Sequence, residues 1–371
     1  MDNKVSNLKE RLISIDVLRG FAMFLILAID IGGASVFPTF TKLWGENFAN
    51  AASNQFSYSF SEGLRLCFIA MPMFLFVVGL AIPFSLNKRL LEQSKKGIYL
   101  KIFKRAFILF FLGLVAGGHL LHLKFTNMPV YNNVLEYIGI GYLVCSILVL
   151  NTTLSVQLIL TATLLLGYWV IFLIIPVPGW QGEIFSGQMN LAIYVDNIVL
   201  GPFHKPGSWQ VLATLSFISN MLIGVLIGHL ILSNRSKENK TKLLFIFGIA
   251  MFLMGYLWGQ FFPVIRSLWT SSYVLLTCGI STLLLAVFYL IIDVWGHSKW
   301  AFPFVVFGAN SIAVYMMAHL FDFRLIGNII IGGFGSLFSN EMNDFIQAVG
   351  AMIVMWLIMY WMYLKKTFIK I

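Results

Sequence analysis

The chain of 371 residues is 59% hydrophobic and only 11% charged, whereas soluble domains carry about a quarter charged residues. A soluble fold of this length could not bury so much apolar surface, because surface area grows almost as fast as volume. The formal net charge of +10 does not indicate a nucleic-acid partner, because the basic residues stand in short clusters between apolar runs, as the positive-inside rule requires. Composition therefore predicts an integral membrane protein whose solvent is the lipid bilayer.

Apolar runs of about twenty residues, long enough to cross the hydrocarbon core, recur along the whole chain. The first lacks a small-residue cleavage site, so we interpret it as a retained helix and not as a signal peptide. The Gly-rich stretch 326–338 is shorter, which favours a re-entrant or interfacial segment. We predict one all-α domain, 1–371, with about ten transmembrane helices at 14–37, 66–86, 102–123, 133–150, 154–176, 209–232, 243–262, 270–292, 301–321 and 345–364.

The basic residues predict the orientation of these helices. With the N-terminus inside, 19 of the 25 lysines and arginines fall on the cytoplasmic side and six fall outside, which places both termini in the cytoplasm. The densest basic segment, 87–105, is predicted to be a cytoplasmic loop. The outer segments 38–65 and 177–208 are longer than plain connections, and such loops are uncommon without a function. We therefore expect a substrate to be handled at the outer face.

Ionisable residues inside membrane spans are costly and indicate function by default. Asp16 and Arg19 lie three residues apart near the inner end of the first span, a spacing that allows an intrahelical ion pair. This pair either anchors the helix at the interface or belongs to a site. Asp30 stands near the outer end of the same span, before Gly32 and Gly33, which permit close backbone approach. A purely structural role would normally be filled by a residue that costs less free energy to place in the membrane, so Asp30 is a candidate functional group.

His119 and His122 share one helical face at the outer end of the third span. They suggest a proton-shuttling pair or half of a metal site, although histidines bonded to interfacial loops are equally consistent. No neighbouring cluster supplies further ligands, and the three cysteines form no CxxC pair, so no metal is predicted. Other ionisable residues flanking outer span ends are expected to be solvated or paired and not catalytic: Glu136, Asp196, Asp322 and Arg324.

Several stretches resemble the membrane acetyltransferases related to heparan-alpha-glucosaminide N-acetyltransferase, especially their bacterial branch. The first is Arg11-Leu-Ile-Ser-Ile-Asp-Val-Leu-Arg-Gly20, and Pro72-Met-Phe-Leu-Phe-Val-Val-Gly79 looks like the second span of that family. The matching stretches follow the family's order over nearly the whole chain: 11–20, 72–79, 82–86, 190–196, 268–275 and 300–312.

The resemblance implies a reaction. Such enzymes take an acetyl group from acetyl-CoA on the cytoplasmic side and transfer it to an amino sugar on the far side. A histidine in the first outer loop acts as a base or as a transient acyl carrier. An asparagine near the outer end of the first span usually assists it.

This chain departs from the family pattern at those positions. The histidine position falls on Tyr58 and the asparagine position on Asp30; Phe68 and Tyr137 replace an expected aspartate and an expected basic residue. A tyrosine with a pKa near 10 is a poor base at neutral pH without assistance. His119 or His122, predicted on the same side of the membrane, is a possible substitute for the missing histidine.

We therefore expect a membrane acyltransferase of the bacterial cytoplasmic membrane with acetyl-CoA as co-substrate and a sugar-like cell-envelope acceptor. The candidate catalytic residues are Tyr58, Asp30, His119 and His122. The candidate acetyl-CoA-binding residues are Asp16, Arg19, Lys88, Arg89, Lys104 and Arg105. Two alternatives stay open: a catalytically silent relative that acts as a binding or assembly subunit, in a homodimer or with a membrane-protein partner, and a transporter of a polar lipid or sugar.

Overall fold

The structure, a computed structural model, describes residues 12–29, 31–58, 62–118, 129–205 and 210–368. Within these ranges every regular element is a helix, and the only extended pairing is an isolated bridge between Glu62 and Ile265. The predicted all-α class is confirmed.

A helix occupies each of the ten predicted membrane ranges. In chain order they are α2 (Ile13–Ile29), α5 (Ala70–Glu92), α6 (Lys95–Ala116), α7 (Val134–Asn151), α8 (Leu154–Ile174), α10 (Thr214–Leu232), α11 (Lys237–Trp258), α12 (Ser271–Phe288), the bent pair α13 (Phe302–Ala309) and α14 (Ser311–Leu320), and α16 (Asn340–Leu364). Seven helical stretches in the described residues are long and apolar enough to cross a membrane, or eight if the bent pair counts as one span. Of the other two, α2 is only 17 residues long and α6 is rich in basic residues.

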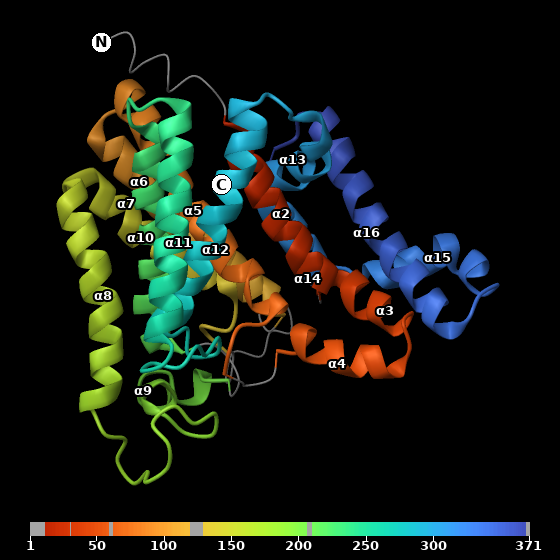
Figure 1. The fold of residues 1–371 in the computed structure, drawn as a ribbon, viewed down its shortest axis with the longest axis horizontal. Helices are drawn as coiled ribbons and strands as arrows, with labels where there is room; N and C mark the ends of the chain where they lie inside the picture. Colours follow the sequence, from red (N-terminus) through yellow and green to blue (C-terminus); the bar gives the residue numbers. More distant parts are fainter. Residues whose placement is uncertain (1–11, 30, 59–61, 119–128, 206–209, 369–371) are drawn as a thin grey trace.

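The connections between α5 and α6, between α10 and α11, and between α12 and α13 lie at one end of the bundle, uppermost in Figure 1. We call this end the basic face, because it carries the clusters predicted to be cytoplasmic. At the opposite face lie the short helices α3 (Val36–Lys42), α4 (Glu46–Phe56) and α9 (Leu191–Val199). The two long outer segments predicted from the sequence are thus partly helical.

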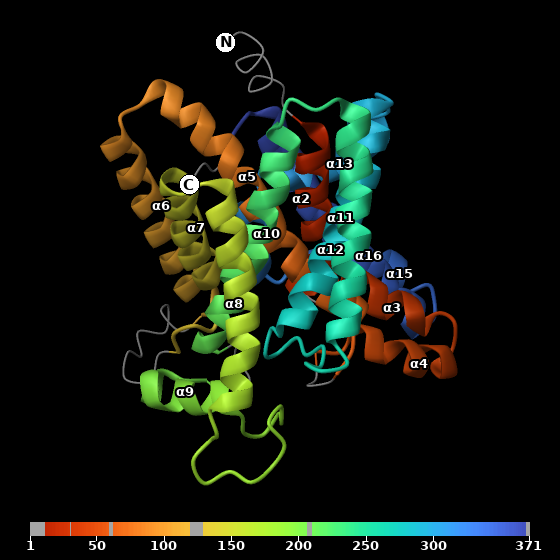
Figure 2. The same cartoon turned by 60° about the vertical axis from the view of Figure 1, so that its left-hand side comes forward.

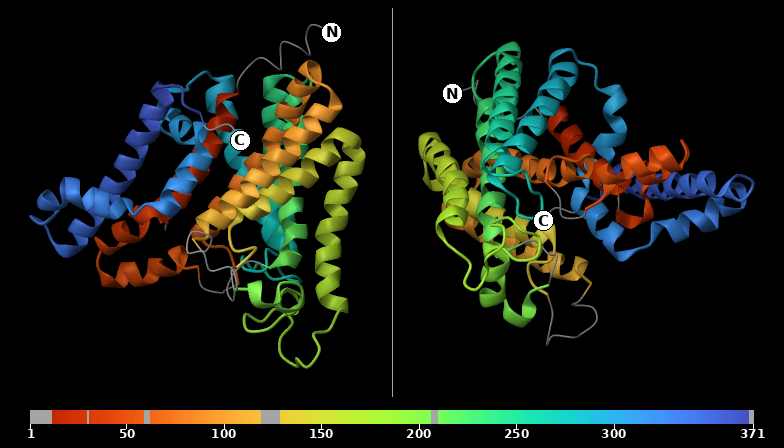
Figure 3. Two further views of the ribbon diagram at one scale, coloured as in Figure 1. Left: turned by 180° about the vertical axis from the view of Figure 1, so that it is seen from behind. Right: turned by 60° about the horizontal axis from the view of Figure 1, so that its bottom comes forward.

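Helices α5, α10 and α12 form the buried centre of the bundle, and α8 and α11 cover it from outside (Figure 2). Helix α2 packs against α5 and α13. Beyond it α3, α16 and the 13-residue helix α15 (Phe323–Gly335) extend to one side as a lateral arm, seen from behind in Figure 3. Helix α15 pairs with α16, and it is the short element expected at 326–338.

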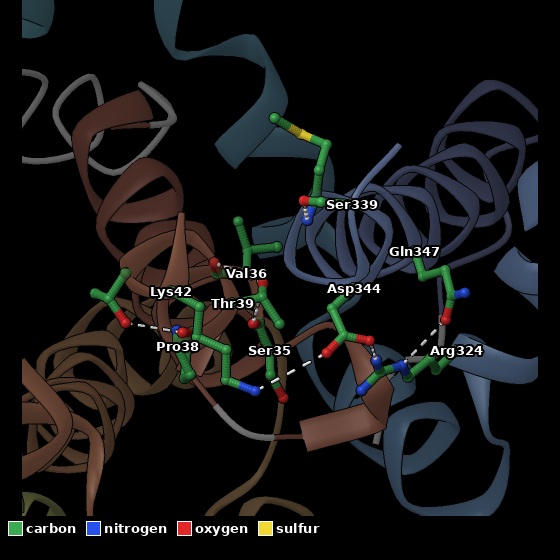
Figure 4. Close-up of polar contacts among 11 residues, drawn as sticks. Ser35, Val36, Pro38, Thr39, Lys42, Arg324, Ser339, Asp344 and Gln347 are labelled. Atoms are coloured by element: carbon green, nitrogen blue, oxygen red, sulfur yellow. Dashed lines mark hydrogen bonds and ion pairs between the residues drawn. The ribbon is translucent and has the colours of Figure 1, made fainter. Parts of the chain in front are cut away.

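An ionic cluster joins the three helices of this arm (Figure 4). The carboxylate of Asp344 on α16 accepts a hydrogen bond from Arg324 on α15 and lies 3.9 Å from Lys42 on α3. The Gln347 side chain also accepts from Arg324. Arg324, expected to be either solvated or paired, is paired. Asp322 is likewise engaged, because it caps α15 by accepting from two backbone N–H groups.

Two sequence-based expectations need correction. Segment 87–105 is not a loop: α5 continues to Glu92 and α6 begins at Lys95, with Ser94 capping α6 by accepting the Gly97 N–H. Basic side chains can extend their charged ends to water from a helix, so the charges do not require a loop. The predicted span 301–321 is not continuous either, because its two helices meet at an angle of 64°.

Candidate functional site

A cavity of about 360 Å³ opens between α2, α5, α6, α7 and the junction of α13 with α14. Its apolar wall includes Phe74, Val78, Leu109 and Ile138, and its polar wall includes Ser85, Tyr142, Asn310 and Ser311. Such a mixture of apolar surface and a few convergent polar groups is typical of a ligand site.

Three arginines from three different helices line this cavity: Arg19 on α2, Arg89 on α5 and Arg105 on α6. Arg19 also makes the predicted pair with Asp16, at 3.5 Å. The guanidinium of Arg105 lies 4.4 Å from the ring centroid of Tyr142. Nη1 of Arg89 and Nε of Arg105 are buried and have no hydrogen-bond partner among the described residues. Buried charged donors are costly when unpaired, so this arrangement favours an anionic ligand.

The break between α13 and α14 adds to the same wall, since residues 308–312 all line the cavity. The first N–H groups of a helix have no intrahelical acceptor and carry partial positive charge. The break therefore places the positive end of α14 beside the three arginines. At the junction itself, the Asn310 amide donates to the carbonyl oxygen of Thr367 at 3.1 Å.

Of the six residues predicted to bind acetyl-CoA, the structure brings Arg19, Arg89 and Arg105 together. Lys88 and Lys104 are exposed and do not line the cavity. Asp16 stands behind Arg19 as its ion-pair partner. On α5 and on α6 the arginine therefore lines the cavity, whereas the lysine that precedes it in sequence is exposed.

Tyr58 lies at the opposite face, where its ring stacks on Phe68 with a centroid distance of 6.5 Å. The guanidinium of Arg266 lies 4.5 Å from the centre of the Tyr58 ring. The two segments also meet through their backbones, because the Gly63 N–H donates to the Val264 carbonyl at 2.8 Å. The Tyr58 ring therefore contacts both an aromatic side chain and a cation, and the same guanidinium lies 5.5 Å from the centre of the Phe68 ring.

The other three predicted catalytic residues, Asp30, His119 and His122, lie outside the described residues. The two glycines after Asp30 do permit the close approach expected of them. A Cβ on Gly32 would lie 3.1 Å from Ala318, and one on Gly33 would lie 2.5 Å from the Cβ of Arg324.

A polar group that the sequence did not reveal lies on α14, between the cavity and the opposite face. Tyr315 follows the cavity-lining Ser311 by one helical turn, and its hydroxyl donates to Asn133 Oδ1 at 3.2 Å. One turn further, His319 Nδ1 lies 2.9 Å from the Tyr315 carbonyl. A carbonyl only accepts, so Nδ1 carries the proton and Nε2 of the neutral ring is the acceptor. No spacing signal distinguished His319, because the contacts that orient it come from the fold.

Two carboxylates expected to be either solvated or paired, Glu136 and Asp196, are buried and hydrogen-bonded. Glu136 is buried and accepts a hydrogen bond from the Tyr131 N–H. Asp196 on α9 accepts from the Val211 N–H at 2.8 Å and lies 3.5 Å from His204 Nδ1. Burial raises the pKa of Asp196 to about 7 and lowers the pKa of His204. The described part of the chain contains no group of three or more His, Cys, Asp or Glu residues placed to hold a metal ion.

A family model described as a domain of unknown function, DUF5009, matches residues 11–221. The chain is 25% identical to heparan-alpha-glucosaminide N-acetyltransferase of Homo sapiens, over 99% of this chain and 61% of that protein. It is 24% identical to the enzyme of the same name from Mus musculus, over 97% of this chain and 60% of that protein. The predicted resemblance is thereby confirmed. The chain spans about three fifths of the length of these curated relatives.

Proposed function

The chain belongs to the family described as domain of unknown function DUF5009, and from its similarity to membrane N-acetyltransferases we propose that it is a membrane acyltransferase. In this proposal it takes an acetyl group from acetyl-CoA on the cytoplasmic side and transfers it to an amino-sugar-like acceptor of the cell envelope. The membrane is the bacterial cytoplasmic membrane, and the basic face is the cytoplasmic one.

The observation that carries the proposal is the convergence of Arg19, Arg89 and Arg105 on one cavity. The CoA moiety bears a diphosphate and a 3′-phosphate, and arginine binds phosphate oxygens through two parallel charge-assisted hydrogen bonds. The positive end of α14 supplies a second element of the kind that binds phosphate. The apolar wall, which includes Phe74 and Val78, would face the pantetheine arm.

Transfer then needs a base on the acceptor side. The acceptor amine attacks the thioester carbonyl carbon, the C–S bond breaks, and the thiolate leaves as the amine loses a proton. Asp30, Tyr58, His119 and His122 stay candidates for the group that takes this proton. We add His319, whose Nε2 is the acceptor nitrogen of a ring already oriented by a backbone carbonyl.

Acetyl-CoA binding to the purified protein in nanodiscs, measured by calorimetry, tests the proposal. We expect saturable binding that weakens about tenfold or more in Arg89→Gln and in Arg105→Gln, since each removes a charge-assisted bond worth about 1.5–3 kcal/mol. Lys88→Gln and Lys104→Gln are matched controls, because each removes one charge from the adjacent position outside the cavity. Absence of binding at millimolar ligand, or equal loss in all four variants, would reject this donor site.

One observation favours the silent-subunit alternative: the residue at the family's histidine position, Tyr58, packs beneath Arg266. That reading predicts no thioester binding together with a protein partner that survives detergent extraction. The transporter alternative draws support from the broken α13–α14 span, since discontinuous helices occur at transporter sites. However, such sites use a pair of broken helices, and the described residues contain one.

A further inference from the structure

A second cavity, of about 430 Å³, lies at the basic face between the start of α2, the ends of α5 and α10, and the start of α11. It shares no lining residue with the cavity assigned to acetyl-CoA. Arg235, Lys237 and Lys240 line it, and no acidic residue does.

The position of one of these cations is fixed by the fold. Lys237 Nζ donates to the carbonyl oxygen of Asp293 at 3.1 Å. Asp293 belongs to a π-helical turn, Tyr289–Val294, that continues α12, and Tyr289 itself lines the cavity. The π-helix is rare and frequently marks a functional site. Here the turn holds Lys237 at the cavity while the ammonium group keeps further donors for a ligand.

Besides the cations, Asn234 and Ser236 contribute polar groups to the cavity, and the remaining wall is largely apolar. Leu12 contributes from just before α2, Phe84 from α5 and Ile231 from α10. A site with three cations and an apolar wall, at the level where membrane helices end, matches a molecule with an anionic head and a hydrocarbon tail. A soluble nucleotide would gain little from the apolar side chains.

We propose that this cavity binds the phosphate head group of an anionic glycerophospholipid from the leaflet at the basic face. Arg235, Lys237 and Lys240 contact the phosphate, and an acyl chain lies along Phe84 and Ile231. The bound lipid joins the α10–α11 connection to the start of α2. This inference does not depend on the acyltransferase proposal, because the two cavities are separate.

Thermal unfolding in nanodiscs tests the lipid site. The full chain is compared in phosphatidylcholine alone and in phosphatidylcholine mixed with phosphatidylglycerol. We expect phosphatidylglycerol to raise the Tm of the wild type and this rise to be lost in Lys237→Gln/Lys240→Gln. Lys95→Gln/Lys96→Gln, which removes two exposed charges from the same face, is expected to keep it.

Three outcomes overturn the proposal. An equal rise in all three proteins would show a general surface-charge effect. An equal rise from inorganic phosphate in phosphatidylcholine nanodiscs would indicate a soluble phosphate ligand. Weaker acetyl-CoA binding in Lys237→Gln/Lys240→Gln would assign the cavity to the donor. The acyltransferase proposal is judged separately, by Arg89→Gln and Arg105→Gln.

Discussion

Folding moves a proton from His204 to Asp196, so the two residues together bind the same number of protons in the folded and in the unfolded chain. In the unfolded chain between about pH 4 and pH 6.5 the carboxylate is charged and the imidazole protonated, which is one proton in total. In the folded protein burial raises the pKa of Asp196 and lowers that of His204. At pH values above the lowered pKa of His204 and below the raised pKa of Asp196 the pair again holds one proton, so in that range it gives the wild type little pH dependence of stability.

Single substitutions should reveal two opposite dependences of stability on pH. In His204→Gln the raised pKa of Asp196 acts alone, so stability is greatest below about pH 4 and falls until about pH 7, by at most about 1.4 kcal/mol per pH unit. In Asp196→Asn the lowered pKa of His204 acts alone, and stability falls as the pH drops below about 6.5. Thermal unfolding of the three proteins from pH 4.5 to pH 7.5 measures these slopes. Parallel curves for all three would contradict this account.

His319 allows a second prediction at the residue scale. If its Nε2 takes the proton of the acceptor amine, His319→Gln should lower kcat for acetyl transfer by about 10²–10⁴-fold. Acetyl-CoA affinity should stay unchanged, because His319 does not line the donor cavity. His297→Gln, at the basic face, is the control. A loss confined to acetyl-CoA affinity, or an unchanged pH–rate profile, would exclude the role of base.

At the scale of the helices, glycines decide how closely the central pair packs. A Cβ on Gly79 of α5 would lie 2.0 Å from the Met221 carbonyl oxygen, and one on Gly224 of α10 would lie 2.1 Å from that of Phe76. Gly224 and Gly228 form a G-x-x-x-G spacing, which lets helix backbones approach in lipid, where hydrophobic burial between helices contributes little. The crossing of α5 and α10 therefore depends on the absence of side chains at these positions.

Gly224→Ala should destabilise the protein by about 1–3 kcal/mol, because the new methyl group requires the two backbones to separate. Gly167→Ala on α8 is the matched control, since apart from its chain neighbours and the local backbone of α8 no atom of the described residues lies within 4 Å of the position that its new methyl group would occupy. Alanine also favours a helix over glycine by about 1 kcal/mol, so the control should be neutral or stabilising. Chemical denaturation in detergent compares the two, and equal effects would show that the crossing tolerates separation.

For the whole molecule, the two faces differ in charge and in secondary structure. The basic face consists of short turns between long helices, whereas the opposite face carries α3, α4 and α9. All three cysteines, Cys67, Cys145 and Cys278, are free and buried. They therefore give a low background for labelling with thiol reagents.

Single introduced cysteines test the predicted orientation. Lys95→Cys at the start of α6 should react with an impermeant maleimide only after the cells are opened. Ser53→Cys on the exposed helix α4 should react in intact cells. The reverse pattern would invert the topology and would also place the arginine cavity on the wrong side for cytoplasmic acetyl-CoA.

The sequence by itself determined the membrane class, the all-α fold, the positions of the apolar helices and the resemblance to the acetyltransferases. These properties follow from local composition, from the thickness of the bilayer and from the order of short motifs, all of which can be read along the chain. Local spacing was also sufficient for the Asp16–Arg19 pair, which lies within one helical turn.

Only the tertiary structure decided which charges share a site. Arg89 and Lys88 are neighbours in sequence with the same charge, but their side chains leave α5 in different directions. Arg89 lines the cavity, whereas Lys88 is exposed. The break between α13 and α14 and the orientation of His319 were also decided there, because both depend on contacts between segments far apart in the chain. A charge count reports only how many cations a segment holds, whereas a binding site depends on where packing makes them converge.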